Sequence, residues 1–150
     1  MADRRMFLAG AGALLLVAGC GGPKAGTLTV SATGTAGMNP GPDGSDRPLT
    51  VQILQLRGTA AFDAADAFAL QSPAASLGAD LLKADLVTLM PGAPVVRAIP
   101  LDPSVAAIGV VAGFRSAGGR SYRYSFSVAP TAEVALKIDV GQGGLVVVQG

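Results

Sequence analysis

Few side chains in this sequence could perform chemistry. The 150 residues contain no histidine and one cysteine, Cys20. The absence of histidine excludes His-based acid–base catalysis and the Ser-His-Asp and Cys-His arrangements. A lone cysteine also cannot form a disulfide within the chain. The remaining candidates are Cys20 and two small groups of polar side chains.

Both polar groups favour a structural interpretation. Asn39, Asp43 and Asp46 could suggest a calcium loop, but the alternating oxygen ligands and the distal Glu of an EF-hand are missing. Asp63 and Asp66 form a carboxylate pair near the start of a predicted helix. There they are expected to favour the helix dipole and solvent contact rather than acid–base catalysis. We therefore predict no catalytic residue, no metal site and no cofactor.

Cys20 ends the sequence Val17-Ala18-Gly19-Cys20, which resembles the bacterial lipobox. In that motif the cysteine thiol receives a diacylglycerol, the leader is cut off and the new N-terminal amine is acylated. Small residues beside the cut let the backbone enter the peptidase. We therefore predict lipidation of Cys20, which would leave no free thiol for a metal site. The alternative is an ordinary signal peptide with an incidental cysteine.

Residues 1–19 have the features of a secretory signal. Arg4 and Arg5 precede an apolar run of about a dozen residues, whereas a membrane span needs roughly 20. The segment from Arg4 to Leu8 also resembles a twin-arginine signal, with the ordinary Sec route as the alternative. Gly21, rather than Asp, follows the cysteine. By the sorting convention of proteobacterial lipoproteins, this indicates the outer membrane.

The mature chain is predicted to form one domain. Residues 20–26 are a short Gly/Pro tether, and the domain spans residues 27–150. Acidic and basic side chains balance once the leader is removed, which argues against binding nucleic acid or anionic lipid by charge. Half of the residues are hydrophobic, enough for a core. The 21 glycines and 10 prolines favour short strands separated by turns.

Alternating apolar residues predict a mainly β fold. Strands are expected at 27–32, 49–56, 86–90, 94–101, 106–114, 122–128, 134–140 and 145–148. A helical insertion is expected at about 59–83, in two pieces at 58–70 and 72–83, with Thr59 and Ser72 as caps. The pattern predicts an antiparallel β-sandwich with a small helical insertion.

The apolar residues of two predicted strands indicate how each strand is buried. The apolar phase of strand 49–56 changes at Ile53-Leu54, which indicates a bulge or burial of both faces. Strand 106–114 is nearly all apolar and is expected at the centre of a sheet, with Ile108, Val110 and Phe114 in the core. Its glycines suggest the close approach of another group.

An ordered series of segments resembles one family, the type VI secretion lipoproteins of the TssJ (SciN) family. The segments are Asn39-Pro40, 51–56, Phe62, 65–70, 77–82, Pro91-Gly92, Leu101-Asp102, 108–112 and Phe114-Arg115. Together they cover most of the mature chain, and the lipobox also fits the family. Tyr122 departs from the pattern, in which Trp is common before the arginine.

The resemblance implies a transthyretin-like sandwich tethered inside the outer membrane. It implies a non-catalytic scaffold whose partner is the periplasmic domain of TssM, with TssL in the wider membrane complex. In the family, the loop between the first two strands is associated with that contact. Here that loop is Gly34 to Pro48, and its expected contact residues are Met38, Asn39, Pro40, Asp43, Asp46 and Arg47.

Each part of this loop has an expected role in binding. Its prolines restrict the backbone, so less freedom would be lost on docking. Met38 would offer an adaptable apolar contact, and the polar residues would provide register. Two other classes of function remain open: a periplasmic ligand-binding or carrier lipoprotein, and a hydrolase working without His or Cys.

Overall fold

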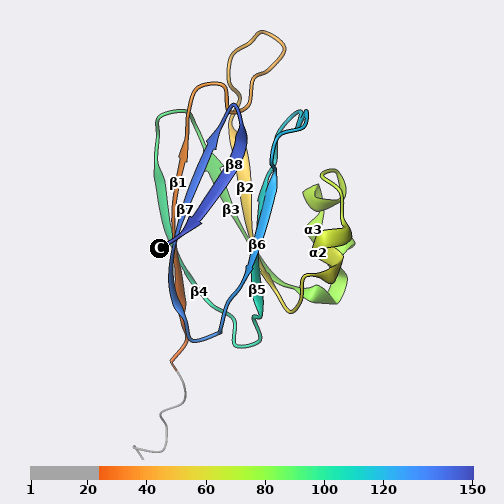
Figure 1. The fold of residues 1–150 in the computed structure, drawn as a ribbon, viewed down its shortest axis with the longest axis vertical. Coiled ribbons are helices and arrows are strands. Elements are labelled where there is room, and N and C mark those ends of the chain that lie inside the picture. Colours follow the sequence, from red (N-terminus) through yellow and green to blue (C-terminus); the bar gives the residue numbers. More distant parts are fainter. Residues whose placement is uncertain (1–23) are drawn as a thin grey trace, which may run out of the picture.

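The computed structural model describes residues 24–150, so the predicted signal peptide, Cys20 and the first tether residues lie outside the described part. Two four-stranded sheets pack face to face, with short helices beside one of them (Figure 1). The strands are β1 (Thr27–Gly34), β2 (Leu49–Leu56), β3 (Leu81–Leu89), β4 (Val95–Pro100), β5 (Ala107–Ala112), β6 (Arg123–Ser127), β7 (Glu133–Gly141) and β8 (Gly144–Gln149). The helices are α2 (Ala60–Ala64), α3 (Pro73–Leu77) and the 3₁₀ turns η2 (Ala69–Gln71) and η3 (Gly78–Asp80). The predicted β-sandwich with a small helical insertion is confirmed.

The strand orders are β4-β1-β7-β8 and β3-β2-β5-β6. Neighbouring strands are antiparallel except for β1 and β7, which run parallel from Thr27 opposite Glu133 to Gly34 opposite Val140. The prediction of a wholly antiparallel sandwich is therefore wrong for this pair. The direction of pairing depends on how distant strands connect, and alternation of side chains along a strand carries no information about that.

The main core lies between the two sheets. In β1, Leu28, Val30 and Ala32 are fully buried, whereas Thr29 and Ser31 on the other face are exposed. This alternation is expected for a strand with one face on the core and one face in solvent. Further buried members of this core are Val51, Ile53, Ile108, Val110, Leu136, Ile138 and Val140.

A second apolar cluster lies between the helical insertion and the outer face of β2 and β5. Leu54 and Val111 join Phe62, Leu70 and Leu77 of the insertion in this cluster. Both faces of β2 and β5 are therefore covered, which explains the apolar phase change at Ile53-Leu54. The sheet has a register shift as well, but it falls between Gln55 and Leu56.

The insertion contains less helix than predicted. The first helix ends at Ala64, and Ala65 is extended. Asp66 then accepts a hydrogen bond from the Ala69 N–H, at 2.8 Å, and local side-chain bonds of this kind compete with helix continuation. The second helix ends at Leu77, and β3 begins at Leu81 rather than at residue 86 because β2 offers a strand partner. Thr59 and Ser72 occupy the N-cap positions without a side-chain cap hydrogen bond.

The central strand β5 has the predicted character. All six of its residues are buried, and Gly109 lies against the ring of Phe62: a Cβ at Gly109 would lie 2.7 Å from a ring carbon. The expected close approach is therefore confirmed. Ile108 and Val110 belong to the core as predicted, but Phe114 lies beyond the end of β5 and is only partly buried.

Within residues 24–150, no helix combines the length and the apolar character needed to cross a bilayer.

Candidate functional site

The loop from Gly34 to Pro48 joins β1 to β2 and projects from one end of the sandwich (Figure 1). The first described residues, which precede β1, lie at the opposite end. Gly37 and Gly44 adopt φ values of +85° and +83°, a region that favours glycine. The loop therefore lies at the end of the sandwich opposite to the first described residues.

The neck of the loop is closed by the Asp46 carboxylate. Its oxygens accept hydrogen bonds from the N–H of Gly37, at 2.9 Å, and from the N–H of Asn39, at 3.0 Å. The Arg47 N–H donates to the Asn39 carbonyl at 2.8 Å, and Pro40 and Asp46 form a β-bridge. The hydrogen bonds from Gly37 and then Asn39, with a smaller effect of the Arg120 charge, lower the pKa of Asp46 below its ordinary value of 3.8.

Asn39 is buried and holds the base of the loop in place. Its Nδ2 donates to the Pro48 carbonyl at 3.1 Å, and its Oδ1 accepts from the N–H of Arg115 at 2.9 Å. A polar side chain buried at this level needs such partners. Asn39 is therefore a structural residue, and the prediction that it contacts a partner directly is corrected.

Met38 is fully buried in the main core. Its sulfur lies so close to Gly34 that any side chain at that position would collide with it. The expectation that Met38 offers an adaptable apolar contact is therefore wrong. The methionine anchors the loop to the sandwich instead, because removing its apolar side chain from water stabilises the fold.

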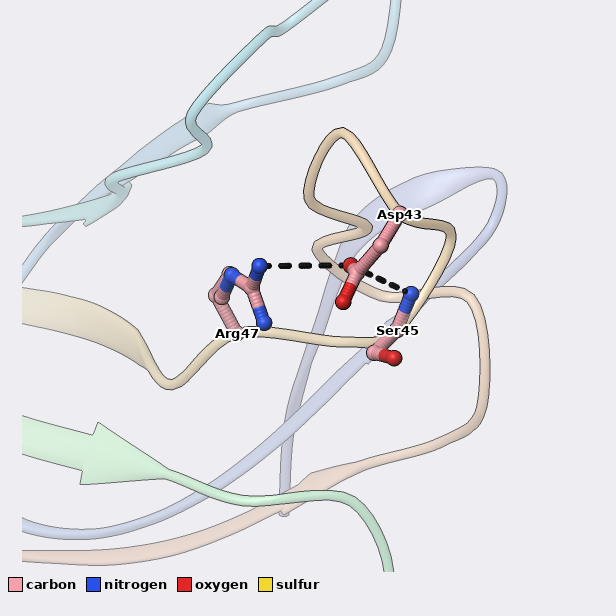
Figure 2. Close-up of polar contacts among 3 residues, drawn as sticks. All are labelled: Asp43, Ser45 and Arg47. Carbon is pink, nitrogen blue, oxygen red and sulfur yellow. Dashed lines mark hydrogen bonds and ion pairs between the residues drawn. The ribbon is translucent and has the colours of Figure 1, made fainter.

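The tip of the loop is exposed at Pro40 and at residues 42–45, and Arg47 beside it is exposed as well. The other exposed residues of the loop are Thr35, Ala36 and Pro48. Asp43 Oδ1 accepts hydrogen bonds from the Ser45 N–H at 3.1 Å and from Arg47 Nη2 at 3.2 Å (Figure 2). Both side chains of the ion pair are largely exposed, 46% for Arg47 and 60% for Asp43. Such a pair adds little stability, so both charges are available to a partner.

Of the six predicted contact residues, Pro40, Asp43 and Arg47 present surface. Asp46 is partly exposed, but its carboxylate is committed to the loop neck. The structure thus brings all six together but separates them into a buried base and an exposed tip. Sequence patterns could not make this division, because a Gly/Pro-rich loop has no periodicity that distinguishes inside from outside.

The segment after β5 forms a second part of the same surface. Arg120 donates from Nη1 to the Met38 carbonyl at 2.7 Å, and its guanidinium carbon lies 5.1 Å from the centre of the Phe114 ring. With the bond from Arg115 to Asn39, these contacts join residues 113–120 to the base of the loop. Sequence analysis did not identify Arg115 or Arg120 as site residues; Arg115 appeared only in the series of segments that resembles the family, and the signal for Arg120 was its charge in a Gly/Ser-rich segment.

The described residues show little potential for catalysis. Across residues 24–150, no group of three His, Cys, Asp or Glu side chains could hold a metal ion. Among the candidates for chemistry, Asp66 bonds a backbone N–H, and Asp43 and Asp46 stabilise their own loop. The arrangement is a shaped, polar surface suited to contact with another macromolecule.

Comparisons with known proteins agree with one another. A family model described as type VI secretion lipoprotein, VasD, EvfM, TssJ (T6SS-SciN) matches residues 26–143. No curated protein sequence matches the chain significantly. The fold is similar to the crystal structure of the T6SS lipoprotein TssJ1 from Pseudomonas aeruginosa, with a TM-score of 0.76 and 26% identity over 85% of this chain and 98% of that chain.

Two further structures share the fold. Serratia marcescens Lip, described as a membrane bound component of the Type VI Secretion System, gives a TM-score of 0.72 at 23% identity over 85% of this chain and 99% of that chain. A chain in the structure described as the T6SS protein TssM C-terminal domain from EAEC gives a TM-score of 0.65 at 25% identity. That match covers 81% of this chain and 97% of the other.

Proposed function

Because the chain belongs to the family of type VI secretion lipoproteins that includes TssJ, we propose that it anchors the secretion apparatus to the envelope by binding TssM. Its role is that of a structural lipoprotein and not of an enzyme. The observation that carries the proposal is the family match over residues 26–143, on a sandwich whose longest loop projects away from the tether end.

The geometry separates the anchoring end from the binding end. The tether of residues 20–26 spans at most roughly 20–25 Å when extended. Acylated Cys20 would therefore hold the first described residues close to the periplasmic face of the outer membrane. The loop at the other end of the sandwich would then face the periplasm, where a partner from the inner membrane can reach it.

The partner that we propose is the periplasmic domain of TssM, with TssL in the wider membrane complex. One of the similar folds comes from a structure that contains the TssM C-terminal domain, which supports this partner. The exposed tip offers Pro40, Asp43 and Arg47 for the contact. Since the loop neck is already closed by hydrogen bonds, little backbone freedom would be lost on docking.

The anchoring half of the proposal is tested with Cys20→Ser in the full chain. One myristoyl-length chain gives only marginal binding, so firm anchoring depends on the several acyl chains of a mature lipoprotein. The variant should leave the outer-membrane fraction, accumulate as a folded domain and abolish secretion. Gly21→Asp is the matched control, because it should remain lipidated but move to the inner membrane. Outer-membrane fractionation of Cys20→Ser would contradict the lipid anchor.

The partner half is tested by purifying the lipoprotein from envelope extracts. Wild type should bring the TssM homologue of the same bacterium with it. Recovery of the lipoprotein without TssM, under conditions that preserve the membrane complex, would contradict the proposed function.

A further inference from the structure

Phe68 is the most exposed large apolar side chain of the described residues, at 87%. It lies between α2 and η2, on a backbone fixed by the hydrogen bond from Ala69 N–H to Asp66 and by one from Gln71 N–H to the Phe68 carbonyl. The rest of the insertion places its aromatic and leucine side chains inward. Aromatic residues, phenylalanine included, are enriched at protein interfaces, and here the backbone that carries the exposed ring is held in place by hydrogen bonds.

Phe68 borders a hollow of about 450 Å³ between the insertion and the segment after β5. Ala67 and Gln71 line the insertion side, and Gly113, Phe114 and Arg115 line the opposite side. The two aromatic rings belong to elements far apart in sequence. An isolated exposed apolar residue needs no explanation, but one on the edge of a hollow with a second aromatic residue is a candidate for a binding surface.

The hollow is physically joined to the loop proposed to bind TssM. Phe114 lies under the Arg120 guanidinium, which itself bonds the Met38 carbonyl, and the N–H of Arg115 bonds Asn39. One wall of the hollow and the base of the loop are thus held by the same contacts. A partner that contacts the base of the loop as well as its tip would lie next to this wall of the hollow.

We propose that the hollow between Phe68 and Phe114 receives an apolar side chain of the TssM periplasmic domain, with a carboxylate of that partner beside Arg115. The assignment rests on the proposed function, since the occupant belongs to the protein that docks on the loop. The hollow would supply the apolar centre of the interface, and the charged loop tip would supply its polar rim. Interfaces commonly have this division, with aromatic anchors at the centre.

The test compares Phe68→Ser with Val96→Ser in the full lipoprotein purified in detergent. Val96 is 65% exposed on β4, in the other sheet, so it is a matched exposed apolar control. The probe is the purified C-terminal domain of TssM from the same bacterium, titrated by calorimetry. We expect Phe68→Ser to weaken binding at least tenfold, and Val96→Ser to leave the affinity within about twofold.

A variant with residues 41–45 replaced by Asn-Gly separates this inference from the proposed function. If that variant loses binding while Phe68→Ser binds like wild type, the hollow is not part of the interface and the proposed function stands. If wild type does not bind TssM at all, both proposals fall.

Site-specific crosslinking gives a direct readout of contact. Cys20 is the only natural cysteine, and its thiol would be acylated, so Phe68→Cys and Val96→Cys each supply one reactive thiol. A photoreactive label at position 68, but not at position 96, should crosslink to TssM. A crosslink from position 68 to a second copy of the lipoprotein, with none to TssM, would overturn the assignment in favour of self-association.

Discussion

The Gly34–Pro48 loop and the helical insertion of residues 57–80 both interrupt the strand order, yet they are held in different ways. The loop sits at the end of the sandwich and is organised by hydrogen bonds to its own backbone, chiefly through Asp46 and Asn39. The insertion covers a sheet face and is held by buried Phe62, Leu70 and Leu77.

Arg123 adds a polar clamp to the insertion. Its Nη1 donates to the carbonyl oxygens of Phe62 and Ala65 and so satisfies carbonyls at the end of α2. The guanidinium carbon also lies 5.9 Å from the centre of the Phe62 ring. A segment that covers a sheet face must bury apolar side chains along its length, whereas this loop buries Met38 at its base and beyond that point satisfies mainly its own backbone. The loop tip is therefore the region that can change without affecting the core.

The largest expected effect is a loss of stability when the helical insertion loses a buried side chain. Phe62→Ala should lower the free energy of unfolding by about 3–5 kcal/mol, because it removes a buried ring and leaves a cavity against Gly109. Urea denaturation followed by circular dichroism measures it, since the chain has no tryptophan. Phe68→Ala is the control in the same insertion and should shift stability by less than about 0.5 kcal/mol. Equal effects would show that the insertion is not held by its buried face.

The base of the loop should behave like the core. Met38→Ala should lower the free energy of unfolding by about 2–5 kcal/mol, since Met38 is fully buried in the main cluster. Ser45→Ala, at the exposed tip, should have almost no effect in the same denaturation experiment. If Met38→Ala were as stable as Ser45→Ala, the whole loop would be independent of the sandwich, and the division into base and tip would be wrong.

The smallest effect concerns the charge on Asp46. The pKa of Asp46 is lower in the folded state than its ordinary value of 3.8. The carboxylate therefore stabilises the fold at pH values above 3.8, and this stabilisation is lost as the pH falls through the lower folded-state pKa. The amide protons of Gly37 and Asn39 should therefore shift together in NMR spectra at acidic pH. Asp46→Asn should remove this transition while the β1 amides remain unchanged. A transition that persists in Asp46→Asn would mean that another group closes the loop neck.

Most of the fold could be predicted from the sequence because the alternation of apolar and polar residues along a strand indicates which side chains are buried. Strand β2 has the expected bounds, and the glycine of β5 contacts another side chain as expected. Two features could not be predicted. The parallel pairing of β1 with β7 depends on topology, and the early end of α2 depends on contacts from Asp66 and the distant Arg123.

The candidate site was only half predictable. The loop itself is evident from its length and its Gly/Pro content, but its internal order is not. Met38 and Asn39 have the residue types of an adaptable contact and a polar contact, and the fold uses both inside. Arg115 and Arg120 become part of the surface only because the end of β5 lies next to the loop.

We propose that the exposed loop tip, and not the loop base, binds the periplasmic domain of TssM. The most direct test replaces residues 41–45 with Asn-Gly, which spares Met38, Asn39 and Asp46, and measures affinity for that domain by calorimetry. We expect an unchanged melting temperature and at least a tenfold loss of affinity. Unchanged affinity in the folded variant would contradict it and would move the interface away from the tip.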